Sequence, residues 1–369
     1  MRGLYLSAGG AKELKLLIAG GGTGGHVIPA LAVAQEWLGR DAKREVVFVG
    51  TAHGIESRLV PAAGLALETI RSAGLKGMGP LRLVRNVLSL APAFWDSAAI
   101  LRRHRVAAAF GIGGYAAGPV MLLAAMKGVP SVIFEPNAQP GFSNRLLAML
   151  ATRMATGYPS VADSWGPRAC FTGCPVRPEF FACAPRRPVA PYRVLITGGS
   201  QGSRAINRAV LSALDLFTAQ QAPISLVHQT GERDYNEVCS AYARRDLRAE
   251  VAPFFADMSE RFAQADLIVC RAGAITVAEV AAAGRAALFI PFGAATDRHQ
   301  LRNAQEMVRA GAARLIPEPE LTGERLAQEV LDLIRQPQQI VELGARARQL
   351  ARPHAARDIA AMIDEVIAS

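Results

Sequence analysis

A run of six residues near the N-terminus, Gly20-Gly21-Gly22-Thr23-Gly24-Gly25, has the composition of an anion-binding loop. It follows the apolar stretch Leu14–Ala19 and precedes an Ala/Leu-rich segment that extends to Trp37, so it joins a predicted strand to a predicted helix. Glycines let the backbone come close to a ligand, and a helix N-terminus offers unpaired N–H groups to an anion. We therefore predict that this loop binds an anionic ligand through its amides.

His26 stands directly after the loop, in the first turn of the predicted helix. A neutral imidazole can take a proton from an attacking hydroxyl near pH 7. A lone histidine is often only structural, but the rim of a glycine loop favours a catalytic role, and we predict His26 to be the general base.

The same loop contains the GxGxxG pattern of dinucleotide-binding proteins. That pattern also requires an acidic residue near the end of the second strand, about 20 residues further on, to bind the ribose. Here the second predicted strand ends at Val49-Gly50-Thr51, and Glu45 lies at its opposite end. No arginine stands there for a 2′-phosphate either, so NAD(P) is the weaker interpretation.

Two segments of the second half could hold a diphosphate and a sugar. Gly198–Gly202 supplies N–H groups and the hydroxyl of Ser200, and Arg271–Thr276 opens a helix predicted over Val277–Ala283. A helix N-terminus carries roughly half a positive charge. Glu279, one turn into that helix, could bridge two vicinal ribose hydroxyls or simply complement the helix dipole.

These loops need strands and helices to position them, and both halves supply the same alternation. Leu14–Ala19 and Tyr192–Thr197 each run into a glycine loop and a helix. Further short apolar strands alternate with helical stretches, at Val46–Val49, Ser131–Phe134, Ser225–His228, Leu267–Cys270 and Ala287–Ile290. The pattern predicts an α/β protein of two Rossmann-like, doubly wound parallel-sheet domains that face each other across a cleft.

A proline-rich stretch separates the halves. Pro178, Pro185, Pro188 and Pro191 lie close together, and proline at this density stops helix and strand. We predict an N-terminal domain over residues 1–178, a linker over 179–191 and a C-terminal domain over 192–344.

The composition describes a folded, basic protein of 369 residues with a formal net charge of +10. Residues 1–177 hold 19 Lys+Arg against 9 Asp+Glu, so the whole excess lies in the first half. No apolar run reaches the ~18 residues that span a bilayer. Lys12, Glu13 and Lys15 stand where a secretory signal would be apolar. The sequence therefore predicts a soluble intracellular protein, and its five cysteines, which form no CxxC pair, predict no metal site.

The basic excess is densest between Arg71 and Arg105, where it flanks an apolar stripe at i, i+3 and i+7 with two aromatic residues beyond Pro92. A short helix of this kind suits an anionic membrane surface, whereas a nucleic-acid binder would not need the stripe. The alternatives are a solvated face and ordinary core. We predict a membrane or acceptor face made of Leu81, Arg82, Val84, Arg85, Leu88, Phe94 and Trp95.

Five segments together resemble one family over nearly the whole chain. They are GGGTGGHVIPALAVA at Gly20–Ala34, GIGGYAAGP at Gly111–Pro119, GGSQGSRAIN at Gly198–Asn207, CRAGAITVAEVAAAG at Cys270–Gly284 and DRHQLRNA at Asp297–Ala304. In their order and spacing they resemble the MurG family, the bacterial UDP-N-acetylglucosamine transferases that convert lipid I to lipid II in peptidoglycan synthesis.

The resemblance implies the GT-B architecture, with the lipid acceptor on the N-terminal domain and UDP-GlcNAc mainly on the C-terminal one. It implies an inverting transfer to the 4-hydroxyl of N-acetylmuramic acid, without metal or other cofactor. The implied partners are UDP-GlcNAc, lipid I and the anionic cytoplasmic face of the inner membrane, where the enzyme is peripheral, and no nucleic acid. In this fold a C-terminal helical segment, here about residues 345–369, usually packs back on the first domain.

Carried over residue by residue, the resemblance gives His26 as the favoured base and Thr23, Gly24 and Gly25 as a loop facing the donor and acceptor diphosphates. Phe255 matches a uracil-contacting position. The other donor-site positions are Asn137, Arg177, Ser200, Ala274, Ile275, Thr276, Val277, Ala278, Glu279 and Gln300.

Two departures affect this transfer. The family often has His-Glu-Gln-Asn where this chain has Phe134-Glu135-Pro136-Asn137. This difference removes one candidate base and strengthens the prediction that His26 is the base. Its usual Gln-Gln pair is His299-Gln300 here. Three alternatives stay open: a UDP-sugar 2-epimerase of the same fold, an NAD(P)-dependent oxidoreductase and a non-catalytic membrane-bound nucleotide sensor.

Overall fold

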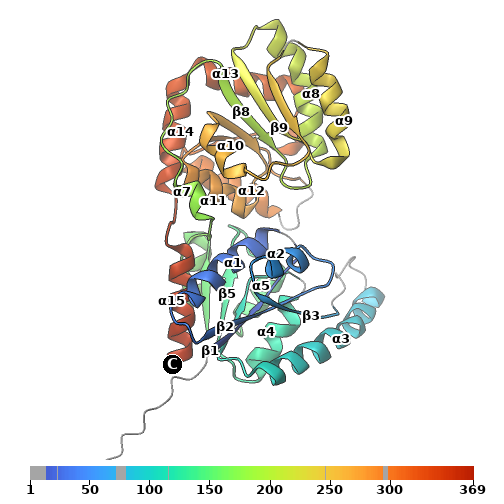
Figure 1. Ribbon diagram of the computed structural model, residues 1–369, viewed down its shortest axis with the longest axis vertical. Coiled ribbons are helices and arrows are strands. Elements are labelled where there is room, and N and C mark those ends of the chain that lie inside the picture. The colour runs from blue at the N-terminus through green and yellow to red at the C-terminus, as the bar shows by residue number, and fades with distance from the viewer. Residues whose placement is uncertain (1–13, 23, 72–79, 115, 246, 294–297) are drawn as a thin grey trace, which may run out of the picture. The chain divides into compact units, whose positions relative to one another are not determined.

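The computed structural model describes residues 14–22, 24–71, 80–114, 116–245, 247–293 and 298–369, except for the side chains of residues 80–90 (Figure 1). The chain forms two compact units. The first comprises the chain up to Glu135, Phe142–Thr172 and Ala356–Ser369, and the second comprises Pro136–Gly141 and Gly173–Ala355.

The first unit is built on a seven-stranded sheet in the order β3-β2-β1-β4-β5-β6-β7, in which every pair of neighbours is parallel. Its strands are β1 (Leu14–Ala19), β2 (Arg44–Gly50), β3 (Ala66–Thr69), β4 (Ala108–Gly111), β5 (Ser131–Glu135), β6 (Arg153–Thr156) and β7 (Ala169–Phe171). Its helices are α1 (Gly24–Leu38), α2 (Glu56–Ala62), α3 (Pro80–His104), α4 (Ala117–Met126), α5 (Phe142–Ala148), α6 (Pro159–Trp165), the short turn η1 (Gly166–Arg168) and α15 (Ala355–Ala368).

The second unit repeats the plan with six parallel strands in the order β10-β9-β8-β11-β12-β13. They are β8 (Tyr192–Thr197), β9 (Ile224–Gln229), β10 (Ala249–Ala252), β11 (Leu267–Cys270), β12 (Ala286–Phe289) and β13 (Arg314–Leu315). The helices and short turns are α7 (Pro178–Phe181), α8 (Arg204–Ala219), η2 (Glu232–Asp234), α9 (Tyr235–Ala243), α10 (Met258–Gln264), α11 (Ala274–Ala283), α12 (His299–Arg309), η4 (Glu318–Glu320), α13 (Gly323–Arg335) and α14 (Pro337–Gln349).

Both faces of each sheet are buried, and the side chains alternate between them with the strand period of two. On β8, Val194 and Ile196 belong to the core beneath α8 and α13, whereas Leu195 between them belongs to the opposite core with α10 and α11. Parallel strands covered on both faces have nearly continuous apolar sequences. The predicted α/β class of two doubly wound parallel sheets is confirmed, and the five short strands predicted from apolar runs lie within two residues of β2, β5, β9, β11 and β12.

Two local predictions were wrong. The basic, apolar segment does not form a short helix, because α3 runs for 25 residues from Pro80 to His104 and contains Pro92, with Ala93 and Ile100 buried in the core. Pro178, the first of the clustered prolines predicted to stop helix and strand, instead begins α7. A proline at the first helical position has no N–H to lose, and its fixed φ suits the helix.

The C-terminal helix α15 is anchored to α1 and β2 of the first unit. Asp364 accepts hydrogen bonds from Trp37 Nε1 at 3.0 Å and from the guanidinium groups of Arg40 and Arg44 at 2.8 and 3.2 Å. Ile359 and Ile363, on the same helix, are fully buried. The last residues of the chain therefore complete the core of the unit that contains the first residues.

Among the described residues, no helix combines the length and the apolar character that crossing a membrane requires.

Candidate functional site

In each sheet the strand order reverses next to the first strand, between β1 and β4 in one unit and between β8 and β11 in the other. Ligands of open parallel sheets bind beyond the carboxyl ends of the strands at such a switch point. The predicted loops Gly20–Gly25 and Gly198–Gly202 follow β1 and β8, and Arg271–Gly273 follows β11. The topology thus places each predicted loop at the ligand-binding edge of its own sheet.

Close backbone packing shapes the first glycine loop. A methyl group added at Gly20 would lie 2.2 Å from the side chain of Ile112, and one added at Gly114 would lie 2.4 Å from the carbonyl oxygen of Gly21. Gly22 and Gly114 both have positive φ, at 91° and 83°. The loops after β1 and β4 can therefore pack together only as glycines.

Glu56 is a residue of this site that the sequence analysis missed. Its side chain is fully buried at the start of α2, and its carboxylate accepts hydrogen bonds from the N–H of Gly22 at 2.8 Å and the N–H of Thr51 at 2.9 Å. Burial raises the pKa of this carboxyl, but the bonds from Gly22 and Thr51 outweigh burial and lower it. Glu56 is the first acidic residue after β2, and its carboxylate binds the glycine loop itself. In a dinucleotide site, an acid at this place would bind a ribose.

His26 lies half-buried in the first turn of α1, which begins with Gly24 and Gly25. A methyl group added at Gly113 would lie 3.4 Å from His26 Nε2 and 3.5 Å from both side-chain amide atoms of Asn144. Asn144 is buried and donates to Glu135 Oε2 at 2.9 Å, while its Oδ1 finds no acceptor role among the described residues. The side chains of His26 and Asn144 therefore both lie beside Gly113. Thr23, a predicted member of this loop, lies outside the described residues.

The predicted membrane face falls on α3. The backbone there is helical at Leu81, Arg82, Val84, Arg85 and Leu88, but their side chains lie outside the described part of the chain. Phe94 is half-buried and Trp95 is 73% exposed.

Further exposed apolar side chains lie on neighbouring helices of the same unit. Helix α4 packs against both α3 and α5, and it lies beside α3 in Figure 1. Large exposed apolar side chains on or just after α4 and α5 are Met126, Phe142, Leu146, Met149 and Leu150. Lys127, Arg102 and Arg145 are exposed on the same three helices or at their ends. We call these exposed residues, together with Trp95, the α3–α5 surface.

The second unit holds its glycine loop through a buried amide. Gln229, at the end of β9, donates from Nε2 to Thr197 Oγ1 at 3.2 Å and to the carbonyl of Gly199 at 3.0 Å. Its Oε1 accepts the N–H of Phe255 at 2.8 Å. One side chain thus ties the loop that carries the exposed Ser200 to the segment that carries Phe255.

Phe255 itself is buried, with its ring 4.4 Å from the guanidinium carbon of Arg261. The neighbouring Phe254 is 56% exposed. A nucleobase could therefore contact the backbone of Phe255 and the ring of Phe254, a residue that the sequence analysis did not select.

Helix α11 begins at Ala274, three residues before the predicted start, so that Ala274, Ile275 and Thr276 form its N-terminal turn with Val277 and Ala278 following. Ile275 and Val277 are buried, whereas Ala274, Thr276 and Ala278 are half-buried. Glu279 is 9% exposed and lies 3.4 Å from the Nη2 atom of Arg177. Burial raises the pKa of Glu279 to about 7, although the charge of Arg177 opposes the rise.

Two other residues predicted to bind the donor substrate, Asn137 and Gln300, form hydrogen bonds within this unit. Asn303 is fully buried, donates to Asn137 Oδ1 at 3.1 Å and accepts the N–H of Ala138 at 2.8 Å. Gln300 accepts the N–H of Phe292 at 3.0 Å. The structure therefore gathers Asn137, Arg177, Ser200, Phe255, the start of α11 and Gln300 in the second unit, and His26 with Gly24 and Gly25 in the first.

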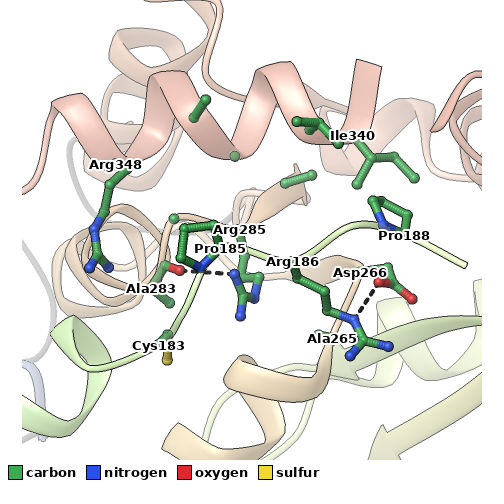
Figure 2. A pocket seen from close by; sticks show the side chains of 15 residues that line it. Cys183, Pro185, Arg186, Pro188, Ala265, Asp266, Ala283, Arg285, Ile340 and Arg348 are labelled. Carbon is green, nitrogen blue, oxygen red and sulfur yellow. Dashed lines mark hydrogen bonds and ion pairs between the residues drawn. The ribbon is translucent and has the colours of Figure 1, made fainter. Parts of the chain in front are cut away.

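A pocket of about 280 Å³ on the second unit is separate from these residues (Figure 2). Its arginines are occupied by the protein: Arg186 binds Asp266 at 2.6 Å, and Arg285 donates to the carbonyls of Ala184, Phe262 and Ala263. This pocket lies where the segment after α7 packs against the rest of the second unit. Within the described ranges, no group of three or more His, Cys, Asp or Glu side chains could hold a metal ion.

Comparison with known proteins gives matches over both units. The glycosyltransferase family 28 N-terminal domain matches residues 16–156, and the family 28 C-terminal domain matches residues 193–361. A protein of Solibacter usitatus (strain Ellin6076), named UDP-N-acetylglucosamine--N-acetylmuramyl-(pentapeptide) pyrophosphoryl-undecaprenol N-acetylglucosamine transferase, is 44% identical over 358 residues, which are 95% of each chain.

Solved structures are also similar to this chain over both units. The crystal structure of Acinetobacter baumannii MurG has a TM-score of 0.79 and 31% identity, covering 95% of this chain and 99% of that one. A UDP-GlcNAc 2-epimerase from Neisseria meningitidis has a TM-score of 0.67, covering 95% and 100%, but only 13% identity, so it shares the fold alone.

The pKa of Glu279 predicts how stability depends on pH. A carboxyl whose pKa is about 7 in the folded state and 4.5 ordinarily stabilises the fold fully below about pH 4.5 and loses that contribution as the pH rises through about 7. The loss corresponds to ~3 kcal/mol. Relative to Glu279→Gln, the wild type should therefore lose about that much free energy of unfolding across this range, measured by urea denaturation. The exposed Glu260, replaced by Gln, is the control, and parallel pH profiles for wild type and Glu279→Gln would contradict the assignment.

Proposed function

The chain belongs to the MurG family, within glycosyltransferase family 28, and from this membership we propose how its residues move N-acetylglucosamine from UDP-GlcNAc to lipid I to form lipid II. The observation that carries the activity is identity of 44% across both units, over 95% of a relative named for this transfer. Similarity to the 2-epimerases is confined to the fold, and the acid behind β2 is committed to the glycine loop. The epimerase and oxidoreductase interpretations therefore have less support.

The second unit binds the donor in this proposal. The N-terminal turn of α11, at Ala274–Thr276, points its free N–H groups and its positive dipole end toward the diphosphate. Glu279 accepts hydrogen bonds from the ribose hydroxyls, and Arg177 beside it adds positive charge. Asn137, Ser200 and Gln300 contact the sugar and phosphates, and the backbone at Phe255 contacts the uracil.

The reaction is a single displacement. The oxygen of the acceptor 4-hydroxyl forms a bond to the anomeric carbon while the bond from that carbon to the diphosphate oxygen breaks, which inverts the configuration. His26 takes the hydroxyl proton, and the electron pair of the broken bond leaves with UDP.

The leaving diphosphate is stabilised by fixed dipoles and by Arg177, without a metal. Preorganised N–H donors aimed at developing charge require no reorganisation during the reaction. Backbone amides of Gly24 and Gly25 and the N-terminus of α11 supply such donors.

The enzyme acts as a peripheral protein at the cytoplasmic face of the inner membrane, and the α3–α5 surface is its membrane contact. Exposed aromatic and aliphatic side chains insert at the acyl boundary, and the surrounding lysine and arginine residues attract anionic headgroups. The acceptor lipid thus reaches the same unit that carries His26.

The transfer is tested with labelled UDP-GlcNAc and a lipid I analogue. We expect the disaccharide lipid to form at an unchanged rate in excess EDTA, because no step uses a metal. Without acceptor, no UDP and no epimerised sugar nucleotide should be released. Epimerisation without acceptor would contradict the transferase, and a rate abolished by EDTA and restored by Mg²⁺ would contradict metal independence.

His26→Ala should lower kcat by about 10²–10⁴-fold, the usual contribution of a general base. The affinity for UDP, measured by calorimetry, should stay within about twofold, because the replacement leaves the contacts proposed for UDP, the backbone amides of Gly24 and Gly25 and the groups of the second unit, in place. Replacement of the exposed His53 by Ala is the matched control. Near-normal turnover of His26→Ala would remove this residue from the role.

Membrane binding is tested by flotation with vesicles of phosphatidylglycerol and phosphatidylcholine. The triple replacement Trp95→Ser, Phe142→Ser and Met149→Ser should reduce the bound fraction at least ~10-fold, because each side chain contributes apolar area to insertion. The control replaces Val189 and Val341, exposed apolar residues of the second unit, by Ser. Turnover of a water-soluble acceptor analogue should not change. Equal flotation of all three proteins would exclude the α3–α5 surface as the membrane contact.

A further inference from the structure

Glu56 has the features of a residue selected for its effect on the glycine loop. It is fully buried, and it is 34 residues away in the chain from Gly22, whose N–H it accepts at 2.8 Å. The N–H and hydroxyl of Thr51 complete its partners at 2.9 and 2.8 Å. A buried charge is costly unless hydrogen bonds satisfy it, and here each carboxylate oxygen has a donor.

Three glycines keep the space that this carboxylate occupies. A methyl group added at Gly21 would lie 2.2 Å from Glu56 Oε1, and one added at Gly54 would lie 2.1 Å from Oε2. A methyl group at Gly50 would lie 2.5 Å from the Cγ atom of Glu56. Residues of the loop, the end of β2 and the following turn therefore all lack a side chain where Glu56 lies.

The predicted catalytic group, His26, lies close to both the glycine loop after β1 and the loop after β4. Gly114 packs on the carbonyl of Gly21, and the adjacent Gly113 lies against His26 and Asn144. Helix α1 begins two residues after Gly22, so His26 follows the bonded amide by four positions. A shift of Gly21 and Gly22 would move both the start of α1 and the loop against which the imidazole lies.

The interaction needs a carboxylate and not merely a polar group of that size. All three partners donate, so a glutamine would turn its NH₂ group toward an N–H or O–H donor. The hydrogen bonds from Gly22 and Thr51 overcome burial and lower the pKa, which keeps the group ionised at neutral pH.

We propose that Glu56 is a positioning residue that fixes the Gly22 amide and, through it, the first turn of α1 with His26, and thereby sets the rate of turnover. This inference rests on the proposed transfer with His26 as base.

Glu56→Gln is the direct test, because it keeps the volume and removes one acceptor. Misplacement of a catalytic group by about 1 Å can cost about 10²-fold in rate, so kcat should fall roughly 10–100-fold. Exchange of the Gly22 amide proton, followed by NMR, should speed up at least ~10-fold. Glu45→Gln, which alters an exposed carboxylate paired with Lys15 in the same unit, is the control and should change neither quantity.

A double-mutant cycle separates positioning from a general loss of stability. If Glu56 acts through His26, Glu56→Gln should cost less than about threefold in kcat when His26 is already Ala. An equal fold-loss in both backgrounds, or unchanged exchange at Gly22, would overturn the proposal.

A second variant and a second background separate the proposal from a loss of folding and from a wrong assignment of the base. If Glu56→Gln does not fold, Thr51→Val removes only the hydroxyl donor, and it should give a smaller loss of kcat that is also suppressed in His26→Ala. If His26→Ala keeps normal turnover, the general-base assignment fails by itself, and Glu56 is then judged by Gly22 exchange and kcat in the wild-type background. Normal values of both in Glu56→Gln would overturn it.

Discussion

The close approach of one backbone loop to another at the carboxyl edge of each sheet is the constraint on which the rest of this structure depends. In the first unit the carbonyl of Gly21 lies where a side chain at Gly114 would be. In the second, a methyl group at Gly202 would lie 1.9 Å from the carbonyl of Thr230, and one at Gly231 would lie 2.3 Å from that of Gln201. At these positions the glycines have no side chain that could hold the loops in place. Another part of each unit must therefore fix them.

Both units solve this problem with the second strand of the sheet. Glu56, just beyond β2, accepts the N–H of Gly22, and Gln229, at the end of β9, donates to the carbonyl of Gly199. In dinucleotide-binding folds the same region supplies an acid to the ribose of the ligand. Here the polar side chain is buried and used inside the protein. The acid that a dinucleotide site would present to its ligand is therefore an internal support of the glycine loop in this chain.

Much of the fold could be predicted from the sequence because parallel strands buried on both faces are continuous apolar runs, and glycine loops follow them directly. Leu14–Ala19 and Tyr192–Thr197 are both strands with the predicted bounds. Glu56 could not be predicted in the same way, because its carboxylate meets Gly22 only after β2 pairs beside β1. Gln229 directly follows the predicted strand Ser225–His228, where its amide resembles any polar boundary residue. The continuation of α3 through Pro92 depends on tertiary packing of Ala93 and Ile100, which the local sequence does not reveal.

The charge of the first half also has a different meaning once pairing is considered. Arg71 is bound by Asp96, and Arg103 and His104 share Glu68, so part of the densest basic stretch is neutralised at short range. A surplus of ten positive charges over residues 1–177 nevertheless remains, and it acts over about a Debye length of 8–10 Å. Long-range attraction of this kind concentrates a protein at an anionic surface but does not fix its orientation. Orientation requires contacts that depend on position, and exposed apolar side chains of the kind found on the α3–α5 surface can make such contacts. Charge and apolar exposure are therefore suited to separate tasks, attraction and orientation, and both are found on the unit that contains His26.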